Sequence, residues 1–300
     1  MNFELYHDES QEAGYWHGML LVPTQVKSRL LELLENARKQ IGYKECISLK
    51  KVKEKKSKIF TLASAWINIG VASLIQDFKN KKYLSFFGKY EKGKLIPELF
   101  TDVLKCKFIL FCEKDNHMKM QLHKDYGSKV ETIFKMGMKG GLHYLGNQDN
   151  PINIVKIHFD GHEHYRRNID KDRIVKRLTD LKEFCTIEDR LDLIDDRTSN
   201  HNKENSQEYD DCQILQLTDL IVGGFRTYLG QCTREIHKPL NHPIKLLIDA
   251  YIMGFARMKN SRWFNGFCLS QCYLDNNQWV FEEIAYASKD GSEQLILNLN

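Results

Sequence analysis

Apolar residues fall into short runs near the N-terminus and then into helical spacing. Residues 3–8 and 15–22 are two apolar-rich runs on either side of a short polar segment that ends at Gly14, which predicts a hairpin. Leucines at helical spacing follow Thr24, a candidate N-cap, and stop at Gly42. This pattern predicts a helix over residues 24–42.

The middle of the chain alternates between segments with helical spacing and segments with the short apolar runs of strands. Residues 57–78 are apolar enough for a largely buried helix, whereas residues 79–100 fit no single element. Residues 106–114 predict a buried strand, and residues 117–138 predict a helix that ends before Gly140 and Gly141. A further strand is expected over residues 151–161, with Val155, Ile157 and Phe159 on one face and His158 and Asp160 on the other.

The last third of the chain begins with a predicted helix over residues 170–183. Residues 195–211 have almost no apolar content, so we expect an exposed and mobile loop. An apolar helix is predicted over 212–230, another helix over 241–258, and a final strand over 279–285. Strands that alternate with helices predict an α/β protein, and the antiparallel opening hairpin makes the sheet mixed.

Composition places the chain among ordinary globular proteins. It has 300 residues, of which 42% are hydrophobic and 28% charged. No leader-like segment or membrane-length apolar run is seen, so we expect a cytoplasmic protein without membrane contacts. Eight cysteines without short paired spacing predict reduced thiols rather than a disulfide framework.

The net charge of +4 is unevenly distributed along the sequence. Residues 49–58 are rich in lysine, residues 164–177 form a second basic group, and acidic residues gather between 187 and 211. A solvated surface and a polyanion-binding surface explain the basic runs equally well. The candidate contacts to nucleic acid are Lys50, Lys51, Lys53, Lys55, Arg166 and Arg167.

Four residues of the predicted helix over 212–230 recur at steps of three and four and so share one face: Gln216, Asp219, Gly223 and Arg226. An ionised aspartate among so many apolar residues is costly to bury without a partner. An internal pair between Asp219 and Arg226, or a contact with a neighbouring loop, would explain it without any function.

Three aspartates considered together favour a functional explanation. Asp8 and Asp160 lie at the ends of predicted strands, and strand ends in α/β folds converge on a crevice where ligands bind. Asp219 belongs to a helix that must pack on the same sheet. Mg²⁺ or Mn²⁺, which prefer oxygen ligands, would relieve the repulsion between such carboxylates. Two such ions can promote phosphodiester cleavage.

These motifs give the sequence a family resemblance. "YHDES" near the N-terminus, "IHFDG" in the middle and "LQLTDL" late in the chain resemble the domain of unknown function 3800 family, which is marked by a DE pair and a Q-x-x-D. The resemblance implies a ribonuclease H-like fold with a carboxylate metal site, in a family met in bacterial mobile elements and defence loci. It assigns Asp8 and Glu9 to the DE pair, Gln216 and Asp219 to Q-x-x-D, and Asp160 to the strand aspartate.

Some positions depart from the family pattern. Gln11 stands where glycine usually follows DES, and His7 replaces an apolar residue before the aspartate. "KECISLKKV" loosely matches an E-x-K-like element, which makes Glu45 the fourth candidate metal ligand. The resemblance extends to about residue 230. We therefore expect a ribonuclease H-like core over 1–230 with a helical insertion around 55–100, and a C-terminal extension over 231–300 packed on the same domain.

Other site types have weaker support. His158, His162 and His164 with Cys106 and Cys112 are zinc-ligand types, but no C-x-x-C or H-x-x-x-H spacing frames them. His162 and His164, which follow Asp160, are candidates for proton transfer or phosphate contact, against the alternative of solvated loop histidines. Phosphate-binding loops, nucleophile elbows and dinucleotide fingerprints are missing from the sequence.

The sequence thus predicts an Mg²⁺- or Mn²⁺-dependent nuclease that acts on DNA or RNA. Asp8, Asp160 and Asp219 are the expected metal ligands, Glu9 or Glu45 assists, and Gln216 orients a ligand or substrate. The resemblance also implies a protein partner in a defence complex. Two alternatives stay open: a non-catalytic nucleic-acid-binding or assembly subunit, and a small-substrate phosphohydrolase with a deep enclosed pocket.

Overall fold

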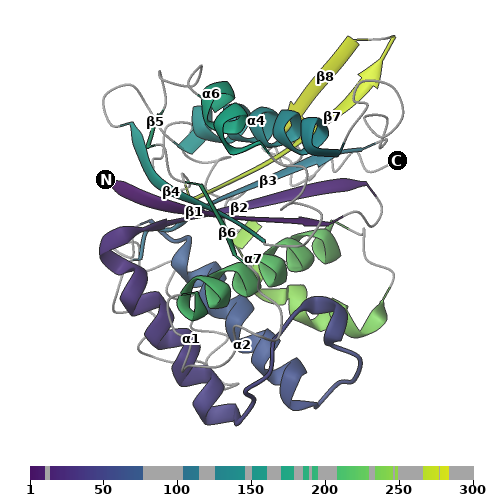
Figure 1. The fold of residues 1–300 in the computed structure, drawn as a ribbon. Helices are drawn as coiled ribbons and strands as arrows, with labels where there is room; N and C mark the ends of the chain where they lie inside the picture. Colours follow the sequence, from purple (N-terminus) through teal and green to yellow (C-terminus); the bar gives the residue numbers. More distant parts are fainter. Residues whose placement is uncertain are drawn as a thin grey trace.

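The computed structural model describes residues 1–10, 14–76, 104–114, 126–145, 151–160, 170–178, 185–188, 191–194, 208–229, 234–245, 247–248, 266–276 and 278–283. In these ranges an eight-stranded mixed sheet lies between helices on both faces (Figure 1). The α/β prediction with a mixed sheet is therefore confirmed.

The elements have the following bounds. The strands are β1 (Asn2–Ser10), β2 (Tyr15–Pro23), β3 (Lys107–Glu113), β4 (Ile152–Asp160), β5 (Cys185–Ile187), β6 (Leu191–Ile194), β7 (Phe267–Asp275) and β8 (Gln278–Glu283). The α-helices are α1 (Lys27–Ile41), α2 (Lys58–Ser73), α4 (Tyr126–Leu145), α6 (Lys171–Leu178) and α7 (Tyr209–Tyr228). Three short 3₁₀ helices are η1 (Thr24–Val26), η2 (Leu49–Lys51) and η9 (Glu235–Asn241).

The sheet has the order β5-β4-β1-β2-β3-β7-β8. β1, β2 and β3 are antiparallel neighbours, whereas β4 runs parallel to β1 and β7 runs parallel to β3. β5 and β6 pair in turn with the first and last parts of β4. Because β1 and β4 are parallel neighbours, their C-terminal ends meet at the same edge of the sheet.

Local sequence accounts for the opening elements. Gly14 closes the hairpin with a φ of +114°, and α1 ends at Gly42, whose left-handed φ of +67° lets its N–H bond Arg38 O. The predicted cap at Thr24 is wrong, because the chain first forms η1 and α1 begins at Lys27 without a side-chain cap bond. α2 begins where expected, with Ser57 Oγ accepting from Phe60 N.

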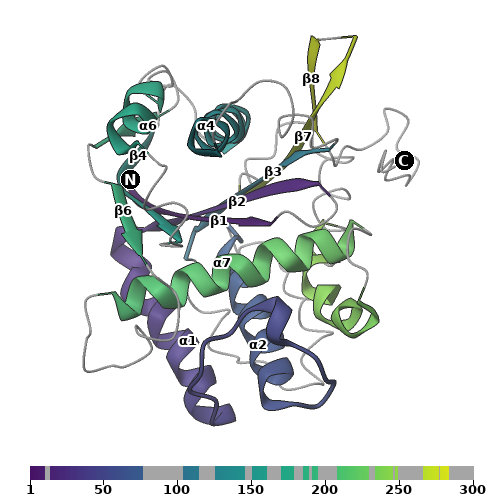
Figure 2. The ribbon, with the colours of Figure 1, turned by 45° about the vertical axis from the view of Figure 1, so that its right-hand side comes forward.

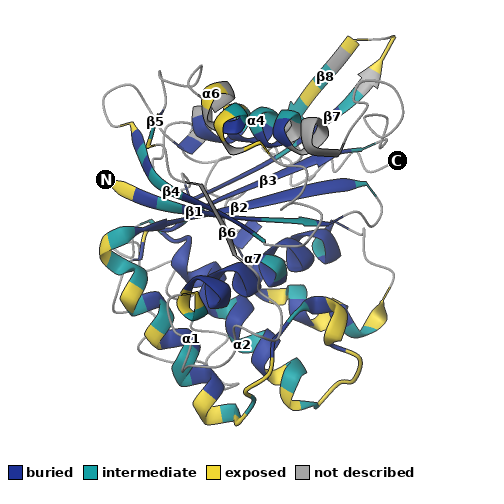
Figure 3. Ribbon diagram, in the orientation of Figure 1, coloured by how far each residue is buried: buried dark blue, intermediate teal, exposed yellow. Residues whose placement is uncertain are grey.

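Each face of the sheet has its own apolar core. α1, α2 and α7 cover one face, where Trp66, Leu217 and Phe225 pack on strand residues such as Leu20 and Phe108. α4 and α6 cover the other face (Figure 2), which is built around Leu5, Phe134 and Phe159. α7 is buried along nearly all of its length (Figure 3). Leu240, Ile244 and Phe267, which lie beyond residue 230, belong to the same core as α7.

Tertiary packing overrides two sequence predictions. Gly140 and Gly141 do not end a helix but lie inside α4, where a Cβ at Gly141 would be 2.4 Å from Ile109 Cδ1. The missing side chain lets α4 approach β3 closely. The pairing of β4 with β1 shifts register between Phe3 and Glu4 of β1, which pair with Ile154 and Lys156 of β4. Val155 therefore leaves the alternation that holds Ile157 and Phe159 on one face.

Other boundaries also differ from the predictions. Residues 209–211, expected in a loop, form the first turn of α7, where Asp210 and Asp211 lie at the positive end of the helix dipole. β7 was missed because its apolar alternation is interrupted by polar residues. β8 occupies most of the predicted final strand. The predictions for 79–100, 117–125, 179–183, 195–207 and 249–258 lie outside the described residues.

Candidate functional site

Asp8 and Asp160 occupy equivalent positions on two neighbouring parallel strands. His7 of β1 is paired with Phe159 of β4, so the next residue on each strand is an aspartate. The Tyr6 and His158 rings, two residues earlier, stack with centroids 4.3 Å apart. Because side chains alternate along a strand, Asp8 and Asp160 project from the same face as this stacked pair. Both aspartates are partly exposed.

Glu9 projects from the opposite face of β1. Its Oε2 accepts a hydrogen bond from Tyr15 OH, and Tyr15 packs with Phe111 and Cys272 on the side of α4. The DE pair is therefore divided between the two faces of the sheet. Adjacent carboxylates at residues 8 and 9 are kept apart by the pleat of the strand.

α7 covers the face from which Asp8 and Asp160 project. Its contacts with the first hairpin progress along both elements in the same order. Tyr6 OH lies 2.7 Å from Asp211 Oδ1, and a Cβ at Gly18 would be 2.0 Å from Val222 Cγ2. Arg226 Nη1 then donates to Ser10 Oγ at 2.5 Å. Gly18 is the pairing partner of Asp8. Asp219, one turn before Val222, thus belongs to the part of α7 that crosses the end of β1.

Gln216 and Asp219 hold the chain segment 47–49 against α7. Gln216 Oε1 accepts from Ile47 N at 2.9 Å and from Arg38 Nη2 at 3.0 Å, while its Nε2 donates to Cys212 O. One turn later, Asp219 Oδ2 accepts from Leu49 N at 2.8 Å. Gln216 is completely buried, so these bonds give it a positioning role rather than a ligand-orienting one. They explain in physical terms why a glutamine and an aspartate lie one helical turn apart on α7.

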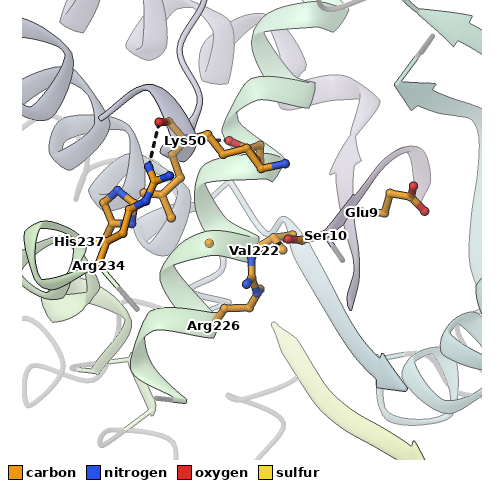
Figure 4. A pocket seen from close by; sticks show the side chains of 10 residues that line it. Glu9, Ser10, Lys50, Val222, Arg226, Arg234 and His237 are labelled. Carbon is orange, nitrogen blue, oxygen red and sulfur yellow. Dashed lines mark hydrogen bonds between the residues drawn. The ribbon is translucent and has the colours of Figure 1, made fainter. Parts of the chain in front are cut away.

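A pocket lies where β1 ends, between α7, η2 and η9. Its lining includes Glu9, Ser10, Leu49, Lys50, Asp219, Val222, Gly223, Arg226, Arg234 and His237, and its volume is about 110 Å³. Figure 4 shows Arg226 beside Ser10, with the Glu9 carboxylate directed away from both. Asp219 and Arg226, expected to share a helix face, thus meet in one pocket.

The other candidate residues are placed as follows. Lys50, Lys51, Lys53 and Lys55 are exposed; of these, Lys50 lines the pocket and Lys51 Nζ donates to Cys46 O. Glu45 is exposed, and its backbone carbonyl accepts from Arg38. Cys106 and Cys112 are buried in the apolar core. His162, His164, Arg166 and Arg167 lie outside the described residues.

A second acidic group lies on the same face of β1 and β4, farther from the strand ends. Glu4, His158 and Asp211 each offer one ligand atom, and these atoms lie within 4.8 Å of one another, so the group could hold a metal ion. Lys27 Nζ, however, is 2.8 Å from Glu4 Oε2 and 2.6 Å from Asp211 Oδ1. The ammonium group supplies positive charge to both carboxylates.

Protonation in this second group follows from its contacts. Burial alone would raise the pKa of Glu4, but the bonds from His158 and Lys27 outweigh it and hold that pKa well below its usual value. Burial lowers the pKa of His158, so its imidazole is neutral. Because the Glu4 carboxylate accepts at 2.7 Å, the proton of His158 lies on Nε2.

Sequence reasoning missed the Glu4 group as a unit, although it considered His158 as a zinc ligand. Tyr6 and Glu4 precede Asp8 by steps of two, so strand alternation could have placed them on its face. Lys27 and Asp211 come from other elements, and only the fold brings them there.

Comparison with known proteins adds no further assignment. No protein-family model matches the chain, and no curated protein shows significant similarity to it. Among the described helices, none combines the length and the low polarity needed to cross a bilayer.

Proposed function

We propose that this protein is a divalent-metal-dependent nuclease with a ribonuclease H-like fold. The observation that carries the proposal is the placement of Asp8 and Asp160 on one face, at the adjoining ends of two parallel strands. α7 crosses this face and brings Asp219 to the end of β1. The mixed sheet with helices on both faces supports the fold assignment.

The proposal rests on the donor type of these residues, because among the described residues only Glu4, His158 and Asp211 bring three ligand atoms within 4.8 Å of one another. Asp8, Asp160 and Asp219 supply carboxylate oxygens, the ligands preferred by Mg²⁺ and Mn²⁺. When bound, these ions would activate water and stabilise the leaving oxygen in phosphodiester hydrolysis. The carboxylates hold the cation, while the bonds of Gln216 and Leu49 N fix the segment beside Asp219. Lys50 and the exposed lysines that follow it offer positive charge to a phosphate backbone.

The Glu4 group is less suited to this role than the three aspartates. Lys27 already pairs with both Glu4 and Asp211 there, and a metal ion would have to displace its ammonium. His158 also uses Nε2 to donate to Glu4. We assign this group to the stability of the fold.

The described pocket also helps to rank the alternatives. A volume of about 110 Å³ is well below the roughly 300–1,000 Å³ of a pocket that encloses a small organic substrate. Such a pocket accommodates one group of a longer molecule. This favours a polymeric substrate over the small-substrate phosphohydrolase. A non-catalytic binding subunit would use the same surface, so only a measurement of cleavage distinguishes it from the nuclease.

The test combines cleavage and binding. Wild-type protein with Mn²⁺ is expected to cleave at least one of single- or double-stranded DNA or RNA, and Asp8→Asn and Asp160→Asn should abolish cleavage while binding in EDTA is retained. Asp210→Asn, which removes an exposed carboxylate from α7, serves as the charge-matched control and should cleave like the wild type. A wild-type protein that binds these substrates but cleaves none would instead establish the binding subunit.

A further inference from the structure

The pocket at the end of β1 gathers positive charge around Asp219. Lys50 comes from η2, Arg226 from α7, and Arg234 immediately precedes η9. Arg234 Nη1 donates to the backbone carbonyl of Lys50 at 3.2 Å, which brings these two cationic residues together. Asp219 supplies one negative charge against these three cationic side chains, so the pocket keeps an excess of positive charge that an anion would offset.

Arg226 is the buried member of this set. It is only 5% exposed, and its Nη1 bond to Ser10 Oγ fixes the guanidinium beside the last residue of β1 (Figure 4). A guanidinium carries five N–H donors in a planar fork that matches two oxygens of a phosphate. Ser10 accepts from one nitrogen of that fork, and this bond orients the guanidinium in the wall of the pocket.

His237 lines the opposite part of the pocket. It is buried, and its Nε2 lies 3.1 Å from Val52 O, so the proton is on Nε2 and the ring anchors η9 to the segment after η2. This bond keeps Arg234 and Lys50 on one rim of the cavity. The pocket wall is therefore built from four separate elements, β1, η2, α7 and η9, and combines the buried Arg226 and His237 with the exposed Lys50 and Arg234.

We propose that this pocket is a phosphate subsite, in which Arg226, Arg234 and Lys50 hold one backbone phosphate of the nucleic acid. The inference rests on the proposed function, because it places this phosphate next to Asp219, one of the proposed metal ligands. A volume of about 110 Å³ has room for a group of a few heavy atoms, as a phosphate requires. The planar donor fork of Arg226 matches two oxygens of a carboxylate or a phosphate, and the two further cations suit the higher charge and the additional oxygens of a phosphate.

The experiment measures binding without catalysis. Fluorescence anisotropy of labelled DNA and RNA oligonucleotides in EDTA, over a series of salt concentrations, compares the wild type with Arg234→Gln and Lys50→Gln. Lys238→Gln is the matched control, because Lys238 is exposed on the same η9 element and pairs with Glu235 at 2.6 Å. Arg234 and Lys50 are both exposed, so their replacement leaves the core intact.

The expected result is a loss of about tenfold in affinity for each pocket variant, with the slope of log affinity against log salt reduced by about one. Lys238→Gln should match the wild type in both quantities. Pocket variants that bind oligonucleotides as tightly as Lys238→Gln would overturn the proposal. A second measurement follows the binding of inorganic phosphate by calorimetry. Pocket variants that lose phosphate binding but keep oligonucleotide binding would also overturn it. Because no metal is present, a failed cleavage assay leaves this result unaffected.

Discussion

Two acidic groups lie on the same face of β1 and β4, yet they differ in what surrounds them. Glu4 and Asp211 both pair with the ammonium group of Lys27, which reaches them from α1, and His158 bonds Glu4. Asp8 and Asp160 lie farther along the same strands, near the ends of β1 and β4, and Asp219 of α7 lines the pocket at the end of β1. The first group contains a cation that the fold supplies, and we propose that the second group, at the edge of the sheet, takes its cation from solution.

The largest expected effect concerns the group that contains its own cation. Asp211→Ala removes a carboxylate that contacts Tyr6 and Lys27, and it leaves a half-buried ammonium with less compensation. We expect the free energy of unfolding to fall by about 3–5 kcal/mol. Denaturant unfolding measures it, with Asp210→Ala, an exposed neighbour in the same helical turn, as the control. A loss equal to that of Asp210→Ala would mean that the Lys27 network contributes nothing.

Replacing Lys27 tests the same comparison by removing the cation instead of a carboxylate. Lys27→Met leaves Glu4 and Asp211 without their shared ammonium, so we expect a loss of about 3 kcal/mol in EDTA. Mn²⁺ should then raise the melting temperature of Lys27→Met by more than that of the wild type, because the emptied group gains ligands for a metal. If Mn²⁺ raises both melting temperatures equally, Lys27 is not what keeps metal out.

Acid should remove the smallest part of this stability. The pKa of Glu4 is held below its usual value in the folded protein, so its contribution is complete above the unfolded value of about 4.5 and is lost as pH falls below it. The difference in unfolding free energy between wild type and Glu4→Gln should therefore be constant from pH 7 to about 5 and shrink on further acidification. A difference that grows toward low pH would reverse the assigned sign.

Sequence reasoning located the strands and helices whose signals are local. The hairpin, α1, α2, β3 and β4 follow from apolar runs and from Gly14 and Gly42, and strand-end reasoning placed Asp8 and Asp160 together. α4 continues through Gly140 and Gly141 because Ile109, on another strand, occupies the space of the missing side chain. No local pattern contains such a contact.

In the candidate site, too, the local spacing could be predicted from the sequence but the distant contacts could not. The spacing of Gln216 and Asp219 indicated a shared helix face, but their partners Ile47 and Leu49 are about 170 residues away and emerge only from the fold. The cationic side of the pocket depends likewise on η9, which no sequence motif marked. Lys27 was counted only as part of a helix, although its length lets it reach Glu4 and Asp211.

The most direct test of the account is Mn²⁺ binding by calorimetry, with the free ion followed by electron paramagnetic resonance. We expect the wild type to bind Mn²⁺ and Asp8→Asn, Asp160→Asn and Asp219→Asn each to weaken or abolish binding. Asp211→Asn, measured well below its melting temperature, should bind like the wild type. Mn²⁺ binding that is lost in Asp211→Asn but retained in Asp219→Asn would place the metal in the Glu4 group and contradict the central claim.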